Sequence, residues 1–223
     1  MIKAVIFDLD GTLLNRDSSL QSFVANQYDR FATSLGHIER QSYIRRFIEL
    51  DCRGHVWKDK VYQSLIEEFE IAQVSWQFLL DDYETKFINH CVPFPYLIDT
   101  INLLKQQDYL LGMITNGRTI FQSRSIQGLG IEKYFNTIVI SEAEQIRKPQ
   151  PEIFHIALSK LKTTAKTSVY IGDNPQADVV GAKKADLKAI WKRNQFWSEP
   201  TEADAVINEL DEILPILKQW KNC

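Results

Sequence analysis

The fold is decided by one stretch near the start of the chain, Ile2-Lys3-Ala4-Val5-Ile6-Phe7-Asp8-Leu9-Asp10-Gly11-Thr12. Its short apolar run predicts a buried strand that ends at Gly11. Asp8 and Asp10 then lie at the carboxyl end of this strand, where open α/β sheets place their sites. Two packed acids cost folding free energy unless a cation or a reaction accounts for them. The stretch therefore predicts a site for a hard cation such as Mg²⁺, with one carboxylate as a nucleophile; taken alone, it also fits a solvated acidic turn.

Length and composition narrow the class of protein. The chain has 223 residues, of which 44% are hydrophobic and 25% charged, and its net charge is -3. These values suit one α/β domain with an insertion, and they argue against a nucleic-acid polymer as the main partner. No apolar stretch is long enough to span a membrane, and no signal peptide is recognised. Three cysteines without metal-ligand spacing favour the reducing cytoplasm, and the oligomeric state stays open.

Hydrophobic periodicity divides the chain into two parts. Residues 17–92 show helical spacing and many aromatics, with no convincing strand, and predict an inserted all-helical domain. Residues 1–16 and 93–223 alternate between strand and helix and predict the α/β core. After the first strand, this core is expected to contain strands at 110–114, 137–141, 168–172, 187–191 and 205–207, and helices at 97–106, 119–129, 152–161, 178–185 and 211–220. The fold class is a Rossmann-like parallel sheet with helices on both faces.

Polar residues follow several of the other predicted strands. They are Thr115 and Asn116 in a Thr-Asn-Gly turn, Lys148 before a proline, and Asp173 with Asp178 one helical turn beyond it. Each has an ordinary structural explanation: a capping threonine, a solvated lysine, an acid at the start of a helix. Gathered at one sheet edge with the first two acids, they predict a site for a divalent cation and a phosphoryl group.

The order of these motifs carries a resemblance to a known family. Asp-x-Asp-Gly-Thr, Thr-Asn-Gly, Lys-Pro and Gly-Asp-Asn-x-x-x-Asp together resemble the haloacid dehalogenase-like (HAD) hydrolase superfamily. The likeness runs from Ile2 to the region of Trp191 and is to the phosphatase branch with a helical cap of the C1 type. Within this branch the chain is similar to the nucleotidase-like and phosphoglycolate phosphatase-like members.

The resemblance implies a role for each residue of the motifs. Asp8 is expected to be the nucleophile and a Mg²⁺ ligand. Asp10 is expected to be the general acid and then the general base, with its backbone carbonyl also on the metal. Thr115 and Asn116 would hold phosphoryl oxygens, and Lys148 would stabilise the phosphoryl charge and hold the nucleophile in place.

The last motif is expected to complete the metal site. The resemblance implies that Asp173 is a metal ligand. It implies that Asp178 supports the metal ligands from behind, and a direct contact from Asp178 or Asn174 to the metal is left open.

Taken together, the sequence predicts a Mg²⁺-dependent phosphomonoester hydrolase that acts on a small phosphorylated metabolite through an aspartyl-phosphate. An acid at Asp10 argues against carbon–halogen chemistry, because the dehalogenase branch lacks it. The alternatives are a phosphomutase of the same superfamily and a non-catalytic protein that binds a phosphorylated ligand. Phosphonate cleavage would need a lysine in an apolar setting within the helical part, and the sequence predicts such a setting for neither Lys58 nor Lys60.

Substrate specificity is expected to come from the helical part and from one arginine of the core. Arg53 precedes a glycine and offers a fork of donors, and Trp57 offers a ring for stacking. A helix-breaking turn with an exposed arginine and a buried tryptophan is the competing explanation for this segment. Arg118 directly follows the Thr-Asn-Gly turn and is the third candidate.

Overall fold

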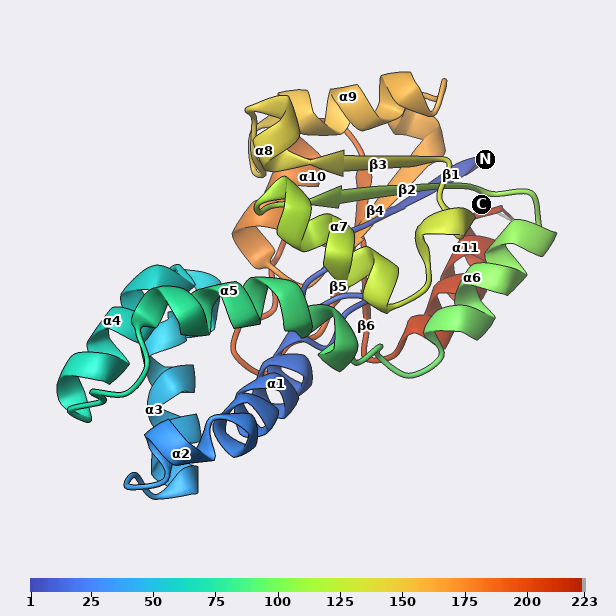
Figure 1. The fold of residues 1–223 in the computed structure, drawn as a ribbon. Coiled ribbons are helices and arrows are strands. Elements are labelled where there is room, and N and C mark those ends of the chain that lie inside the picture. The colour runs from blue at the N-terminus through green and yellow to red at the C-terminus, as the bar shows by residue number, and fades with distance from the viewer. Residues whose placement is uncertain (222–223) are drawn as a thin grey trace. The chain divides into compact units, whose positions relative to one another are not determined.

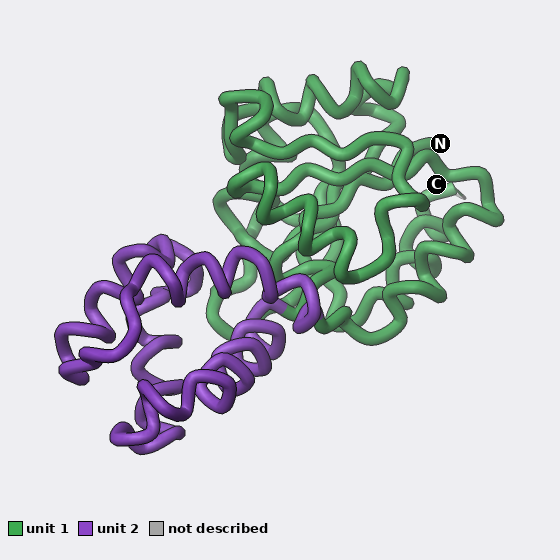
Figure 2. Tube along the Cα trace, in the orientation of Figure 1, with its two compact units in different colours: residues 1–15, 92–223 green, residues 16–91 purple. Residues whose placement is uncertain are grey.

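The structure is a computed structural model that describes residues 1–221. It divides into two compact units, one of residues 1–15 and 92–223 and one of residues 16–91 (Figure 2). We call the first the α/β unit and the second the helical unit. Cys223, one of the three cysteines counted above, lies outside the described residues.

Within the described residues, the α/β unit contains one sheet of six parallel strands in the order β3-β2-β1-β4-β5-β6 (Figure 1). The strands are β1 (Ala4–Phe7), β2 (Leu110–Thr115), β3 (Thr137–Ile140), β4 (Ser168–Gly172), β5 (Lys188–Lys192) and β6 (Ala205–Ile207). Phe7 lies beside Met113 on one side and Ile171 on the other. All the carboxyl ends therefore face one edge of the sheet, and the predicted α/β fold is confirmed.

Helices connect the strands and cover both faces of the sheet (Figure 1). The helices α6 and α7 follow β1 and β2, and α11 packs against α6. The helices α9 and α10 lie on the face of the sheet opposite to α6, α7 and α11, and the π-helix η5 leads into α10. The bounds are α6 (Leu97–Gln106), α7 (Thr119–Gly128), α8 (Ser141–Glu144), α9 (Pro151–Lys160), η5 (Pro175–Val180), α10 (Gly181–Lys184) and α11 (Ile213–Lys221), with short 3₁₀ turns η3 (Glu132–Tyr134), η4 (Ala165–Thr167) and η6 (Leu210–Glu212).

Several observed element boundaries lie one or two residues from the predicted ones, and two differences also change the type of element. Ser141, expected to end a strand, begins α8. The helical segment expected from Asp178 begins instead at Pro175, as a π-helix. Its start is explained by Asn174, whose side chain accepts hydrogen bonds from two backbone amides of the first turn, and by a proline in the first helical position.

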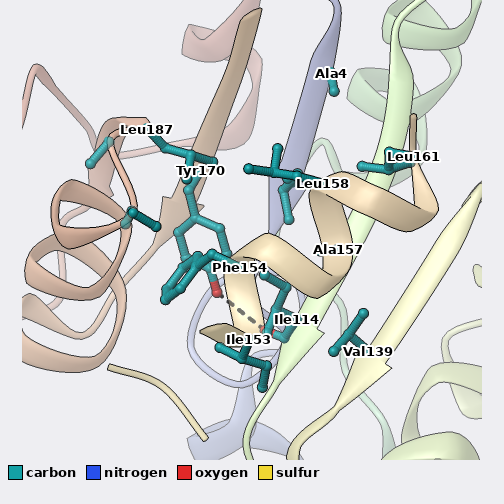
Figure 3. Packing of buried hydrophobic residues seen from close by; sticks show 14 of the residues in the cluster. Ala4, Ile114, Val139, Ile153, Phe154, Ala157, Leu158, Leu161, Tyr170 and Leu187 are labelled. Atoms are coloured by element: carbon teal, nitrogen blue, oxygen red, sulfur yellow. Dashed lines mark hydrogen bonds between the residues drawn. The ribbon is translucent and has the colours of Figure 1, made fainter. Parts of the chain in front are cut away.

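One part of the core of the α/β unit lies between the sheet and α9 (Figure 3). Ile114 and Tyr170 of the sheet face Phe154 of the helix, and the Phe154 and Tyr170 rings meet edge to face at 5.0 Å. The Tyr170 hydroxyl lies 3.1 Å from the Ile114 carbonyl oxygen. Each fully buried side chain of this kind contributes about 1.5–3 kcal/mol to stability, so this layer holds the strand ends in fixed positions.

The helical unit is folded around an aromatic core of its own. Phe47 meets Tyr62 at 5.3 Å and Phe23 meets Tyr83 at 5.2 Å, both edge to face. Its elements are α1 (Arg16–Arg30), α2 (Ala32–Leu35), α3 (Arg40–Asp51), η1 (Cys52–Gly54), α4 (Lys58–Glu68), α5 (Trp76–Lys86) and η2 (Phe87–His90). Across residues 1–221, no helix combines the length and the apolar character that a membrane crossing needs.

The structure adds to what the sequence indicates about one lysine of the helical unit. Lys58 is buried, with its ammonium 5.3 Å from the centre of the Tyr83 ring. This ammonium is paired with the buried carboxylate of Asp51, which also accepts from Arg16 at 2.8 Å. Burial by itself lowers the pKa of a lysine, but a partner acid favours the charged form. The ion pair therefore opposes the neutral amine that phosphonate cleavage would need.

Candidate active site

The carboxyl ends of the three central strands bring the predicted residues together. Asp8 directly follows β1, Thr115 ends β2, and Asp173 directly follows β4. The backbone amide of Asp8 donates to the Ile171 carbonyl at 2.8 Å and so continues the pairing of the strands. All three side chains are buried. Strand register thus aligns Asp8 with Thr115 and Asp173, which lie more than a hundred positions later in the chain.

Lys148 forms the centre of the arrangement. Its ammonium donates to Asp8 Oδ1 at 2.5 Å, to Asp178 Oδ1 at 2.7 Å and to the Tyr170 hydroxyl at 2.8 Å. An ammonium carries three N–H donors, so these bonds fix its orientation. Burial alone would lower the pKa of Lys148, but the charges of Asp178 and Asp8 raise it above its usual value. Lys148 therefore stays charged at neutral pH.

Asn116 positions Lys148 through its backbone. The Asn116 side chain accepts from the Lys148 amide at 3.0 Å and donates to the Lys148 carbonyl at 3.1 Å. This pair of hydrogen bonds joins the turn after β2 to the loop that carries the lysine. The Asn116 side chain has a positioning role that the sequence did not predict, beside the phosphoryl contact predicted for this residue.

Asp178 lies behind the other acids. Its Oδ1 accepts from Lys148 and from the Tyr170 hydroxyl, and its Oδ2 accepts from the Asn174 amide at 2.9 Å. A Cβ at Gly172 would overlap the Asp178 carboxyl group, so glycine at the end of β4 makes room for it. The Asn174 side chain caps η5 as described above, so both residues have structural partners in this turn.

Three carboxylates lie close enough to share one metal ion. Asp8, Asp173 and Asp178 each offer an oxygen, and these oxygens lie within 4.8 Å of one another. Burial is the main cause that raises the pKa of Asp8 well above its usual value, although Lys148 opposes it. Burial and the charge of Asp178 raise the pKa of Asp173 to about 7. A hard divalent cation binds carboxylate oxygens and stabilises the ionised form that burial disfavours. The donor set therefore fits Mg²⁺.

Thr115 supplies the feature that fits a phosphoryl group. Its hydroxyl is buried at the end of β2 and has no hydrogen-bond partner within the described protein. An unpaired buried hydroxyl costs free energy, and few are found in folded proteins. It lies at the same sheet edge as Asp8 and Lys148, where a phosphoryl oxygen would accept a hydrogen bond from it.

The Asp10 side chain is not part of the carboxylate group. It is half-buried, and its Oδ2 accepts from Gln122 Nε2 at 2.8 Å. The sequence predicted a metal contact for Asp10 through its backbone carbonyl, and this stays a prediction. The proton-transfer role that the resemblance implies for its side chain also stays a prediction.

The predicted specificity residues lie in two different units. Arg118 is exposed and directly precedes α7 of the α/β unit. Arg53 is exposed and Trp57 is half-buried, and both belong to the helical unit. Their contact with substrate stays a prediction.

Sequence reasoning missed four residues that hold the site. Tyr170 and Gln122 are described above, Asn194 donates to Asp173 Oδ2 at 2.7 Å, and the Trp191 indole donates to the Asp173 carbonyl at 2.6 Å. None of them stands in a motif. Only Gln122 could have been suspected from the sequence, because helical spacing places it on the same face as Ser125 and Ile126. A glutamine buried on that face needs polar partners.

Comparison with known proteins places this geometry in a family. The family model described as haloacid dehalogenase-like hydrolase matches residues 5–192. The chain belongs to this family. The match includes every motif residue of the site and the whole helical unit, and the predicted superfamily is confirmed.

Individual relatives agree with this assignment. The chain is 26% identical to glyceraldehyde 3-phosphate phosphatase of Pyrococcus furiosus, over 98% of this chain and 94% of the relative. It is also 26% identical to the pyrophosphatase PpaX of Bacillus mycoides, over 98% of both chains. The HAD-hydrolase YfnB of Bacillus subtilis, solved with magnesium, has a TM-score of 0.74 at 21% identity and covers 97% of this chain and 98% of its own, a likeness of fold. The predicted enzyme class, a phosphatase, is confirmed at the level of the family and these relatives.

Proposed function

We propose that the protein is a Mg²⁺-dependent phosphomonoester hydrolase that forms an aspartyl-phosphate on Asp8. The observation that supports it most is the placement of three groups at one sheet edge. They are the buried Asp8 carboxylate, the Lys148 ammonium that contacts it, and the Thr115 hydroxyl that has no partner in the described protein. A carboxylate nucleophile suits attack on an anionic phosphoryl group when a fixed cation and a hydrogen-bond donor lie beside it to balance the phosphoryl charge.

In the first step, an Asp8 oxygen forms a bond to phosphorus while the bond from phosphorus to the ester oxygen breaks. Asp10 donates its proton to that ester oxygen, and the alcohol leaves. In the second step, Asp10 takes a proton from water as the water oxygen bonds to phosphorus, and the bond from phosphorus to the Asp8 oxygen breaks. Inorganic phosphate leaves, and both carboxyl groups return to their initial states.

The other residues stabilise charge during both steps. Thr115 and the Asn116 amide would donate to phosphoryl oxygens, and Lys148 would balance their charge while it holds Asp8. Asp8, Asp173 and the Asp10 carbonyl would hold Mg²⁺, which supplies charge neutralisation for the phosphoryl oxygens. Asp178 would orient Lys148, since both of its oxygens already accept hydrogen bonds. The magnesium in the YfnB structure supports this choice of metal.

The substrate is proposed to be a small phosphorylated metabolite. Both named relatives are phosphatases of small molecules by their names, one for glyceraldehyde 3-phosphate and one for pyrophosphate. Since their named substrates differ and both are 26% identical to this chain, identity alone does not choose between them. We propose that Arg53, Trp57 and Arg118 take part in the selection of the substrate. We also propose that the protein lies in the cytoplasm, because its cysteines are few and lack metal-ligand spacing.

The test is phosphate release from a panel of sugar phosphates, nucleoside monophosphates, phosphoglycolate, glyceraldehyde 3-phosphate and pyrophosphate, with Mg²⁺ or with EDTA. We expect Mg²⁺-dependent release in the native protein and a loss of at least about 10³-fold in Asp8→Asn, which keeps the shape of the side chain and removes the nucleophile. Asp99→Asn, an exposed acid on α6, is the matched control and should retain full activity.

Two outcomes would contradict the proposal. Transfer of the phosphoryl group to a sugar without accumulation of phosphate would indicate a mutase. Binding of phosphorylated compounds by folded, Mg²⁺-loaded protein without turnover would indicate a binding protein.

A further inference from the structure

Gln122 bridges two parts of the site that are far apart in the sequence. From α7, its Nε2 donates to Asp10 Oδ2 at 2.8 Å and to the Asn116 carbonyl at 2.9 Å. The side chain is 3% exposed, although glutamine is a residue that normally faces solvent. Both partner atoms are acceptors, so this end of the amide must be the NH₂ group. Gln122 therefore joins the turn after β1 to the turn after β2.

The backbone is shaped to admit this side chain. Gly117 has a φ of +154°, and a Cβ added there would lie 2.6 Å from Gln122 Nε2. Any other residue at position 117 would push the amide away from Asp10. The opposite end of the amide, Oε1, is buried without a hydrogen-bond partner within the described protein. The Gln122 amide is thus held in place by its two donated bonds, at the cost of leaving Oε1 unpaired.

We propose that Gln122 is a positioning residue that holds the Asp10 carboxyl group in the orientation for proton transfer. This inference rests on the proposed function, in which Asp10 protonates the leaving oxygen and then activates water. The Gln122 donor occupies a lone pair of Oδ2 in both protonation states of Asp10, so the travelling proton is carried on Oδ1. A lysine or arginine in this place would favour the ionised form of Asp10 through its positive charge. The Gln122 amide is neutral and orients the carboxyl group without that charge.

The bond to Asn116 extends this role to the phosphate-binding turn. The Asn116 carbonyl accepts from the same Nε2 as Asp10, while the Asn116 side chain holds the Lys148 backbone. One amide therefore sets the position of the proton donor relative to the turn that would bind the phosphoryl group. Proton transfer depends on such alignment, because the donor must lie within hydrogen-bond reach of the leaving oxygen.

The experiment compares two leaving groups in Gln122→Met, which keeps the length of the side chain and removes its donor. With Mg²⁺ present, kcat/KM is measured for glycerol 3-phosphate, whose alkoxide needs a proton to leave, and for p-nitrophenyl phosphate, whose phenolate leaves without one. We expect kcat/KM to fall about 10- to 100-fold for the alkyl ester, as for the loss of one hydrogen bond to a charged group, and less than about threefold for the aryl ester.

The second step offers an independent readout. Because Asp10 must also activate water, Gln122→Met should slow the breakdown of the aspartyl-phosphate and lower kcat for both esters. A burst of p-nitrophenolate in the first turnover should then appear or grow. A residue that merely supports the fold would lower both kcat/KM values together and produce no burst.

Two further variants complete the design. Gln122→Glu keeps the size of the side chain and replaces the donor by an acceptor, so we expect the same selective loss of kcat/KM for the alkyl ester. This variant tests the inference even where Gln122→Met does not fold. Gln127→Met, an exposed glutamine on the same helix, is the matched control and should change nothing.

The inference and the proposed function fail in different ways. A native protein that releases phosphate from neither these two esters nor any compound of the panel, with Mg²⁺ present, contradicts the proposed function. A native protein that is active, with equal losses or no loss for the two esters in the Gln122 variants, contradicts the inference alone.

Discussion

Each buried carboxyl group of the site accepts a hydrogen bond, but the three acids outnumber the one buried lysine that contacts them. Asp8, Asp173 and Asp178 are all buried, and Lys148 is the cation that bonds to two of them. Asp173 accepts instead from the neutral amide of Asn194. This imbalance explains why the pKa of Asp173 is raised by burial and by its neighbour Asp178. A bound divalent cation would remove the imbalance, which makes metal binding and pH interdependent.

The pH dependence of stability follows from these pKa shifts. The unfolded value for Asp173 is 3.8 and the folded value is about 7, so the folded protein holds a proton that the unfolded chain releases. This contribution to stability is fully present below about pH 4 and is lost as the pH rises through about 7. A Mg²⁺ ion bound by the Asp173 carboxylate would take the place of this proton. We therefore expect Mg²⁺ to raise the melting temperature more at pH 8 than at pH 5.

Thermal unfolding with EDTA or Mg²⁺ at both pH values measures this difference. At a Mg²⁺ concentration of about 100 times Kd, the gain at pH 8 should approach about 2.7 kcal/mol. Asp173→Asn should reduce both the Mg²⁺ effect and its pH dependence. An equal shift at the two pH values in the native protein would contradict the expectation.

Among the elements, the turn η1 of the helical unit has the most unusual backbone. Cys52, Arg53 and Gly54 all have positive φ, at 46°, 56° and 83°. Non-glycine residues in this region cost free energy and need support from their surroundings. The support comes from Asp51, whose carboxylate accepts from the Gly54 amide at 2.9 Å and pairs with Lys58 and Arg16. The exposed Arg53 is therefore presented by a turn that a buried ion cluster holds.

Loss of Asp51 should destabilise the helical unit strongly. Asp51→Ala leaves the buried Lys58 ammonium without its partner acid, and we expect a loss of about 3–5 kcal/mol in the free energy of unfolding. The double variant Asp51→Leu with Lys58→Met should recover part of this loss, because the buried Lys58 charge is removed together with its partner acid. Recovery should be incomplete, because the partly exposed Arg16 and the Gly54 amide still lose their acceptor. Urea unfolding measures both.

A surface ion pair in the same unit provides the control. Arg46 and Glu68 are partly exposed and lie 2.6 Å apart, so Glu68→Ala should cost no more than about 1 kcal/mol. Equal losses for Asp51→Ala and Glu68→Ala would show that the buried cluster has no special role.

For the whole molecule, the two units are joined by chain segments that lie side by side within the α/β unit. The Asn15 amide donates to the Val92 carbonyl at 2.8 Å, and Leu14 forms an antiparallel bridge with Pro93. The helical unit is therefore an insertion whose two ends leave the α/β unit at one place. All the proposed catalytic and metal-binding residues belong to the α/β unit.

This arrangement predicts that the α/β unit folds alone. A shortened chain in which a brief Gly/Ser linker replaces residues 16–91 should unfold cooperatively and should still gain stability from Mg²⁺, because its sheet and its carboxylates are intact. Its preference among phosphate esters should be weaker if Arg53 and Trp57 contact substrate. Circular dichroism with thermal unfolding tests the first point, and an unfolded shortened chain would contradict it.

Much of this protein was predictable from local pattern. The apolar runs placed all the strands of the sheet to within a residue or two, because a buried parallel strand needs a continuous apolar sequence. Polar residues directly after those runs marked the site, since the carboxyl ends of parallel strands meet at one edge. The helical insertion followed from its spacing, and the order of the motifs identified the family.

Tertiary structure alone decided which side chains meet. Tyr170 lies within an apolar strand and Gln122 within a helix, and nothing local shows that the first bonds Lys148 and the second bonds Asp10. The burial of Lys58 was likewise not predictable, because its partner Asp51 comes from a different helix. Periodicity reports which face of an element is buried, whereas hydrogen bonds and ion pairs depend on distances across elements. Those distances are set by strand register and helix packing, which act through space and not along the chain.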